Sequence, residues 1–134
     1  MSRRVSRELC MKLLYQLELT KDFNKEKINS FLDEYSYEST DKEYIMSIVE
    51  NFIQNNEYID KLISTHSVGW KLNRIAKVDL SILRLAITEI IYKEDIPLKV
   101  SINEAVELAK RYSDSDSASF INGVLGSVVN EIEK

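Results

Sequence analysis

The sequence predicts an all-α fold of six or seven helices, and three observations support this prediction. The chain of 134 residues has only three glycines and one proline, which favours long helices over turn-rich β structure. Apolar residues recur every three or four positions along most of the chain, the period of an amphipathic helix. Two of these apolar runs start with the capping-box pattern of a helix N-terminus. The length fits a single domain over residues 1–134.

The first helix is expected from Ser2 to about Leu19. Its core stripe repeats every four residues and comprises Val5, Leu9, Leu13 and Leu17. A second face, with steps of three and four, carries Arg4, Arg7, Met11 and Tyr15. This helix therefore combines a core stripe with arginines in line with an aromatic ring.

A shorter helix is expected over residues 25–34, and a loop over residues 35–39 follows it. Thr40 and Glu43 form a capping box that predicts the next helix start. The apolar pattern of that helix continues through Ile63, with a bend near residues 55–56, and residues 66–69 end it.

Residues 70–93 form the most apolar segment, and nearly every turn between residues 82 and 91 is hydrophobic. A helix that is hydrophobic most of the way round is normally buried on several sides, so we expect this one to be central. Arg84 and Glu89 interrupt it. Each needs a partner or solvent, because an unpaired buried charge costs too much free energy.

Two helices are expected after the break that Pro97 imposes. Ser101 and Glu104 form the second capping box, which predicts a helix that reaches Tyr112.

Residues 113–117 form a polar link, and the last helix has its apolar face between residues 120 and 132. Gly123 lies inside that last helix, where glycine costs about 1 kcal/mol relative to alanine. Close approach of another backbone would explain it.

The formal net charge of −4 is unevenly distributed. Residues 1–21 carry five bases against two acids, whereas residues 22–60 carry three bases against ten acids. Residues 61–134 carry ten of each. A basic end on an acidic protein indicates a local anionic partner.

The residue inventory makes an enzyme the weaker class of hypothesis. His66 is the only histidine and lies at an expected helix end, where the C-terminal dipole suits it. Cys10 is the only cysteine and lies on the edge of the core stripe. These two residues cannot build the usual zinc site, and the glycines fit no phosphate-binding loop. We therefore assign no catalytic residue, no metal and no cofactor.

The same inventory favours the cytoplasm. A single cysteine rules out an internal disulfide and agrees with a reducing compartment. No apolar run approaches the roughly 20 residues of a membrane span, and no apolar segment follows the N-terminal arginines as in a signal peptide.

The N-terminal arginines are a better functional signal. Arginine neutralises phosphates, and a nearby tyrosine gives an unpaired base a ring to stack on. Arg3, Arg4, Arg7 and Tyr15 supply both within about three turns. A solvated helix face with a tyrosine at its border explains this spacing equally well, so the spacing alone leaves both interpretations open.

Several blocks of sequence carry a resemblance to a known family. They are residues 2–8 with Leu14-Tyr15, residues 70–89, Ile96-Pro97 with residues 100–110, and residues 120–125. The blocks at 100–110 and 120–125 are highly specific at this spacing. On these blocks the chain resembles, over essentially its whole length, the NusB family of bacterial transcription antitermination factors.

The resemblance implies two small helical bundles packed together and a role without catalysis. The implied partners are the boxA element of nascent ribosomal RNA, the small-subunit ribosomal protein NusE, and the antitermination complex on RNA polymerase. The implied RNA contacts are Arg3, Arg4, Arg7, Tyr15, Asp79, Asp116 and Phe120. The NusE surface falls on the C-terminal bundle, without assignment to single residues.

These contacts suggest separate roles. The arginines would engage phosphates, and the two aromatic residues would stack on bases. Carboxylates repel phosphate, so Asp79 and Asp116 make sense mainly as acceptors for base edges. For Phe120 a core position is at least as good an explanation. Val5, Ser6 and Ser119 stand where relatives often carry basic or small residues, which predicts weaker RNA binding alone and more reliance on NusE.

Three other hypotheses remain open. Some ribosomal RNA cytosine methyltransferases carry a NusB-like RNA-binding domain at their N-terminus, and this chain has no catalytic domain after it. The acidic segment 22–60 would suit a protein-only scaffold. A homodimer through a surface that overlaps the RNA site would inhibit RNA binding.

Overall fold

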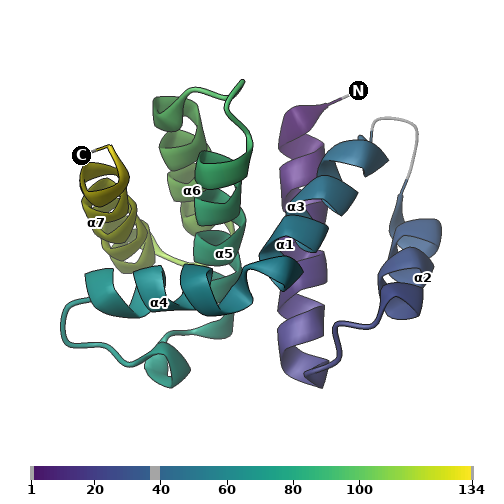
Figure 1. The fold of residues 1–134 in the computed structure, drawn as a ribbon, viewed down its shortest axis with the longest axis horizontal. Coiled ribbons are helices and arrows are strands. Elements are labelled where there is room, and N and C mark those ends of the chain that lie inside the picture. The colour runs from purple at the N-terminus through teal and green to yellow at the C-terminus, as the bar shows by residue number, and fades with distance from the viewer. Residues whose placement is uncertain (1, 37–39, 134) are drawn as a thin grey trace.

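The computed structural model describes residues 2–36 and 40–133, and all regular structure within them is helical. The helices are α1 (Arg3–Thr20), α2 (Lys25–Tyr35), α3 (Lys42–Gln54), α4 (Asn56–His66), the short 3-10 helix η1 (Leu72–Arg74), α5 (Lys77–Tyr92), α6 (Leu98–Tyr112) and α7 (Ser115–Ile132). They form two groups, α1–α3 and α4–α7, that lie side by side (Figure 1). The all-α prediction and the two-bundle arrangement are confirmed.

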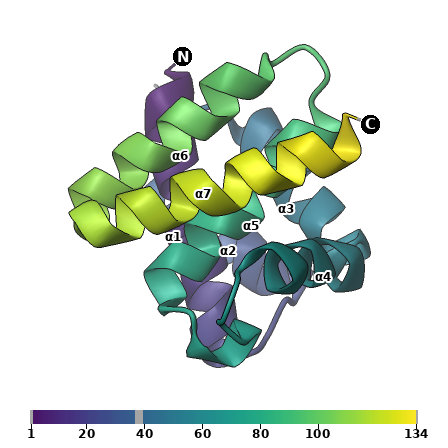
Figure 2. The same ribbon diagram turned by 90° about the vertical axis from the view of Figure 1, so that its left-hand side faces the viewer.

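Helix α5 is the centre of the fold, as predicted. Every residue from Asp79 to Ile90 is buried. The helix packs against α1 and α3 on one side and against α4, α6 and α7 on the other. Figure 2 shows α6 and α7 crossing in front of it. Apolar burial around one helix therefore joins the two groups.

Helix α1 begins where the sequence predicts. The Ser2 hydroxyl caps it by accepting a hydrogen bond from the Val5 N–H at 3.2 Å. Its core stripe is buried from Leu9 to Leu17. The second face is not free, because Arg7 and Met11 are buried as well.

The bend between α3 and α4 is confirmed, since α3 ends at Gln54 and α4 begins at Asn56. The predicted cap of α3 is wrong by one residue. Asp41, not Thr40, is the N-cap, and its carboxylate accepts from the Tyr44 N–H at 3.1 Å. Two adjacent residues could both cap, and the sequence pattern does not choose between them. In the preceding loop, residues 37–39 lie outside the described part of the chain.

The capping box at Ser101 is wrong. Helix α6 begins at Leu98, directly after Pro97, whose fixed φ suits a helix start. The Ser101 hydroxyl instead donates to the buried Glu89 carboxylate at 2.8 Å.

The link before α7 is shorter than predicted. The α7 N-cap is Asp114, which accepts from the Ser117 N–H at 2.8 Å, so Asp116 and Ser117 lie in the first turn of the helix. The close contact expected at Gly123 is also wrong, because a Cβ added there would meet no atom within 4 Å.

Arg84 has the partners that the sequence requires. It donates to Glu18 at 2.8 Å and to Asp60 at 3.0 and 2.9 Å. Burial raises the pKa of Glu18, but hydrogen bonds from Lys21, Arg84 and Lys77 outweigh burial and lower this pKa to about 2. Among the described residues, no helix combines the length and apolar character needed to cross a membrane.

Candidate nucleic-acid interface

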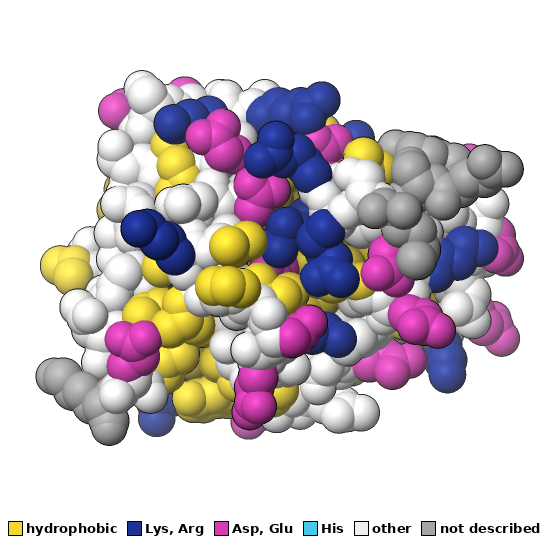
Figure 3. All heavy atoms as spheres, turned by 90° about the horizontal axis from the view of Figure 1, so that it is seen from above, with side chains coloured by type: hydrophobic (Ala, Val, Ile, Leu, Met, Phe, Trp, Pro, Cys, Tyr) yellow, Lys and Arg dark blue, Asp and Glu magenta, His cyan; other side chains and the backbone are white. Residues whose placement is uncertain are grey.

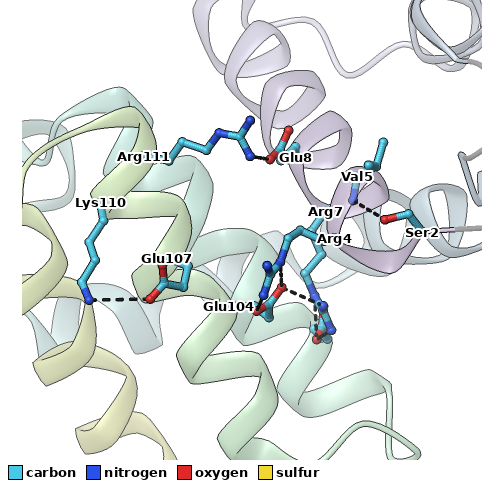
Figure 4. Close-up of polar contacts among 10 residues, drawn as sticks. Ser2, Arg4, Val5, Arg7, Glu8, Glu104, Glu107, Lys110 and Arg111 are labelled. Atoms are coloured by element: carbon cyan, nitrogen blue, oxygen red, sulfur yellow. Dashed lines mark hydrogen bonds and ion pairs between the residues drawn. The ribbon is translucent and has the colours of Figure 1, made fainter.

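The three N-terminal arginines lie in different environments. Arg4 is exposed and pairs with Glu104 at 2.8 Å (Figure 4). Arg3 is half-exposed, with its guanidinium 4.2 Å from the centre of the Tyr44 ring. Arg7 is buried. Only the first two present their guanidinium groups to solvent.

Arg7 belongs to a buried cluster around Glu89. Its guanidinium donates to the Glu89 oxygens at 2.7 and 3.0 Å, and the Tyr44 and Ser101 hydroxyls donate to the same carboxylate. Burial lowers the pKa of Arg7, but the Glu89 carboxylate more than compensates, and the net shift is upward. A phosphate contact by Arg7 would have to break this cluster, so the structure places Arg7 in the interior that joins α1, α3, α5 and α6.

Three cations that sequence reasoning missed lie beside the exposed arginines. Arg111 pairs with Glu8, and Lys110 is exposed on the same turn of α6. With Arg4 they line a hollow of about 250 Å³. Lys12 lies 5.4 Å from the centre of the Tyr112 ring. Lys110 and Arg111 lie in the last turn of α6, where basic residues suit the helix dipole, so their positions in the sequence do not indicate a binding role.

Figure 3 shows the end of the molecule that carries the N-terminus. Lysine and arginine side chains gather there among acidic ones, with hydrophobic side chains beside them. The surface is mixed in charge, and the exposed arginines are held by carboxylates, as Figure 4 shows for Arg4 and Arg111. Such surface pairs are weak, so an incoming phosphate could replace the carboxylates.

Tyr15 continues this surface along α1. It lines a hollow of about 190 Å³ with Met11, Lys12, Val78 and Tyr112. The Tyr112 hydroxyl donates to Glu8 at 3.2 Å, which links this hollow to the one beside Arg111. The Tyr15 ring is thus half-buried between the cations and the start of α5.

The remaining predicted residues meet at the starts of α5 and α7. Asp79, Asp116 and Phe120 line a third hollow of about 300 Å³, together with Trp70, Arg74, Ile75, Ala76, Asp114 and Ser117. Trp70 and Phe120 meet edge to face, with their ring centres 6.4 Å apart. Asp79 is buried and accepts from the Ser117 hydroxyl at 2.9 Å. Phe120 is partly buried and packs against the core with one side.

We call these three hollows together the α1–α6–α7 strip. Its members are Arg4, Lys110 and Arg111, then Lys12, Tyr15 and Tyr112, then Trp70, Arg74, Asp79, Asp116 and Phe120. Asp116 and Phe120 share one hollow as expected, and Tyr15 lies next to it through Val78. Arg7 lines only the hollow that contains Arg4 and Arg111.

The residues considered for catalysis lie elsewhere. Cys10 is fully buried, and burial raises the pKa of its thiol. His66 is in the last turn of α4, with its ring nitrogens 2.6 Å from the Ser127 hydroxyl and 3.1 Å from Glu131. Within residues 2–36 and 40–133, no group of three or more His, Cys, Asp or Glu could hold a metal ion.

The similarity of this chain to known proteins agrees with the all-α fold. A model of the NusB family matches residues 4–130. The chain is 57% identical over 129 residues to the transcription antitermination protein NusB of Acetivibrio thermocellus, covering 96% of this chain and 89% of that protein. A structure of T. maritima NusB superimposes with a TM-score of 0.87 at 36% identity, covering 98% and 92% of the two chains. The NusB chain of a crystal structure of NusB and NusE with double-stranded RNA gives a TM-score of 0.85 at 25% identity, covering 96% of each chain.

Proposed function

The chain belongs to the NusB family of transcription antitermination proteins, and we propose that it binds single-stranded boxA-type RNA of nascent ribosomal transcripts together with NusE. It is an antitermination factor and not an enzyme. In this proposal residues 1–134 act as one RNA-binding domain in the cytoplasm. The RNA-bound pair joins the antitermination complex on RNA polymerase.

The observation that carries the RNA proposal is the α1–α6–α7 strip. It places exposed cations, half-buried aromatic rings and carboxylates in three hollows, which are linked by the Tyr112–Glu8 hydrogen bond and by Val78 next to Asp79. Cations that follow a backbone and rings that stack on bases are the two components of single-strand binding sites. A solved relative of the same fold forms a complex with NusE and double-stranded RNA, which supports NusE and RNA as the classes of partner.

The roles follow from exposure. Arg3 and Arg4 at the start of α1, with Lys12, Lys110 and Arg111, engage phosphates, since their charged groups reach solvent. Tyr15 and Phe120 stack on bases, and Asp79 and Asp116 accept hydrogen bonds from base edges. Arg7 acts indirectly, because its bond to Glu89 fixes the helix that carries Tyr15.

Fluorescence anisotropy of a labelled single-stranded boxA-type RNA tests the proposal, with this chain alone, with NusE alone and with both. We expect weak binding alone and tighter binding with NusE. Five phosphate contacts predict a log–log salt slope of about −3.5, since each single-strand contact contributes about −0.7. Absence of RNA binding with and without NusE would favour a protein-only scaffold.

A matched pair of double variants assigns the surface. Replacing Arg4 and Arg111 with alanine should weaken binding and make the salt slope shallower by about 1.4, because two phosphate contacts are lost. Replacing Lys25 and Lys61, which are exposed on α2 and α4, changes the net charge equally and should leave the slope nearly unchanged. If the two double variants changed the salt slope equally, RNA binding would depend only on the net charge of the protein.

A further inference from the structure

The hollow at the starts of α5 and α7 is lined on one side by Trp70, an aromatic side chain that is not buried in the core. The Trp70 side chain is 53% exposed, although tryptophan is usually well covered. It meets Phe120 edge to face at an interplanar angle of 67°. Since Trp70 precedes η1 in the irregular segment between α4 and α5, its ring can swing away from Phe120 without disturbing a helix. A flat ligand could then lie between the two rings.

The same hollow is lined by the Asp79 carboxylate, one oxygen of which accepts no hydrogen bond from the described residues. Asp79 is 6% exposed, and one of its oxygens accepts from Ser117 at 2.9 Å. Within the described part of the chain, its other oxygen, Oδ1, is buried and has no hydrogen-bond partner. Burial raises the pKa of Asp79 and the Asp114 carboxylate adds to this effect, whereas the Ser117 and Ser113 hydroxyls oppose it. Buried acceptors are nearly always paired, so this oxygen calls for an explanation.

The polar groups around the hollow have a defined order of donors and acceptors. Asp79, Asp114 and Asp116 contribute acceptors, and the exposed Arg74 contributes a guanidinium donor. A ligand that matches them needs adjacent donors and one acceptor beside them. Among the four RNA bases, only guanine presents an N1–H and an N2 amine side by side, next to the O6 acceptor. Adenine, cytosine and uracil would each direct a ring nitrogen or carbonyl acceptor at a carboxylate.

We propose that this hollow holds one unstacked guanine of a single-stranded RNA between Trp70 and Phe120, with its N1–H and N2 amine donated to Asp79 and its O6 accepting from Arg74. The proposal rests on the proposed function, because it assumes that RNA lies along the α1–α6–α7 strip. It adds a selecting residue, Trp70, and a base identity. The hollow of about 300 Å³ is at the small end of ligand pockets, about 300–1,000 Å³, as suits one base.

Tryptophan fluorescence reports on this hollow directly, because Trp70 is the only tryptophan in the chain. The probes are short oligouridines whose central nucleotide is guanosine, inosine, adenosine or uridine. Anisotropy of a labelled copy measures binding in parallel. We expect the guanosine RNA to change Trp70 emission and, because of its two hydrogen bonds to Asp79, to bind about tenfold or more tightly than the adenosine and uridine RNAs. Inosine, which lacks the N2 amine, should fall between them.

Two variants and a control locate the effect. Trp70→Ala and Asp79→Asn should each reduce the preference for guanosine to about twofold or less. Val68→Ala removes another exposed apolar side chain from the same segment, outside the hollow, and should keep the preference. Thermal unfolding of each variant checks that the fold is retained.

The possible failures are distinguishable. If all four RNAs bind equally well and Trp70 emission is unchanged, the guanine site is overturned while the proposed function stands. The guanine site also falls if Asp79→Asn folds normally and still prefers guanosine. If none of the RNAs binds, with or without NusE, the proposed function fails and the guanine site fails with it.

Discussion

Helix α5 carries two buried carboxylates that differ in how fully they are hydrogen-bonded. Glu89, near its C-terminal end, is 1% exposed and accepts hydrogen bonds from Arg7, Tyr44 and Ser101. Asp79, near its N-terminal end, is 6% exposed and has one oxygen without a partner among the described residues. A buried polar network that is fully satisfied rigidifies a core, whereas one that is half satisfied costs free energy until something completes it. We infer that Glu89 serves the fold and Asp79 serves a ligand.

The same contrast separates the arginines of α1. Arg7 is committed to Glu89 inside the protein, whereas Arg4, one turn earlier, pairs with Glu104 at the surface. Their spacing along the sequence is that of one helix face, yet Arg7 is buried in the core and Arg4 is exposed to solvent.

The largest effect should come from breaking the satisfied cluster. Arg7→Ala leaves Glu89 buried without its charge partner, which typically costs about 3–5 kcal/mol of stability. Urea denaturation measures this loss. Arg4→Ala is the matched control and should leave the free energy of unfolding nearly unchanged, because its pair is exposed. Similar losses for the two variants would remove the distinction between the arginines.

A smaller effect is expected at Glu18, another carboxylate that its partners satisfy. Its folded-state pKa is lowered from 4.5 to about 2, so its contribution to stability is complete above pH 4.5 and is lost as the pH falls toward 2. At about 1.4 kcal/mol for each pKa unit, the lowered pKa corresponds to about 3.5 kcal/mol, and screening by solvent reduces the contribution to about 2–3 kcal/mol. Denaturation of the wild type and Glu18→Gln between pH 2 and 7 checks this. The two curves should converge in acid, and a constant gap would contradict the linkage.

Asp79→Asn should have the smallest effect on stability, and of opposite sign. The folded-state pKa of Asp79 is raised, so the folded protein holds this proton more tightly than the unfolded chain does. The wild type therefore loses stability as the pH rises through the raised pKa, and an uncharged asparagine escapes that loss. We expect Asp79→Asn to be as stable as the wild type in acid and more stable than the wild type at pH 7. A variant less stable at pH 7 would show that Asp79 is structural.

Periodicity was sufficient to predict the helices, the central position of α5 and the bend between α3 and α4. It failed where the outcome depended on a partner far away in the chain. Ser101 has the pattern of a cap but is bound to Glu89, and Arg7 has the pattern of a surface arginine but is buried against the same residue. No local pattern reveals such pairs.

The candidate site shows the same limit. The resemblance indicated Asp79, Asp116 and Phe120, and the fold brings them into one hollow. Trp70 and Arg74 were part of the sequence blocks but had no assigned role, because only the folded segment between α4 and α5 sets them beside Phe120. Lys110 and Arg111 lie beside Arg4 only because the fold packs α6 next to α1, and the sequence does not reveal that packing.

The contrast between Glu89 and Asp79 is tested most directly by measuring RNA affinity and melting temperature on the same preparation of Asp79→Asn. The RNA is the oligouridine with one central guanosine, at fixed salt and pH 7. We expect an affinity about tenfold or more weaker, with a melting temperature equal to or above that of the wild type. Unchanged affinity, or a loss of affinity that accompanies a lower melting temperature, would contradict this expectation.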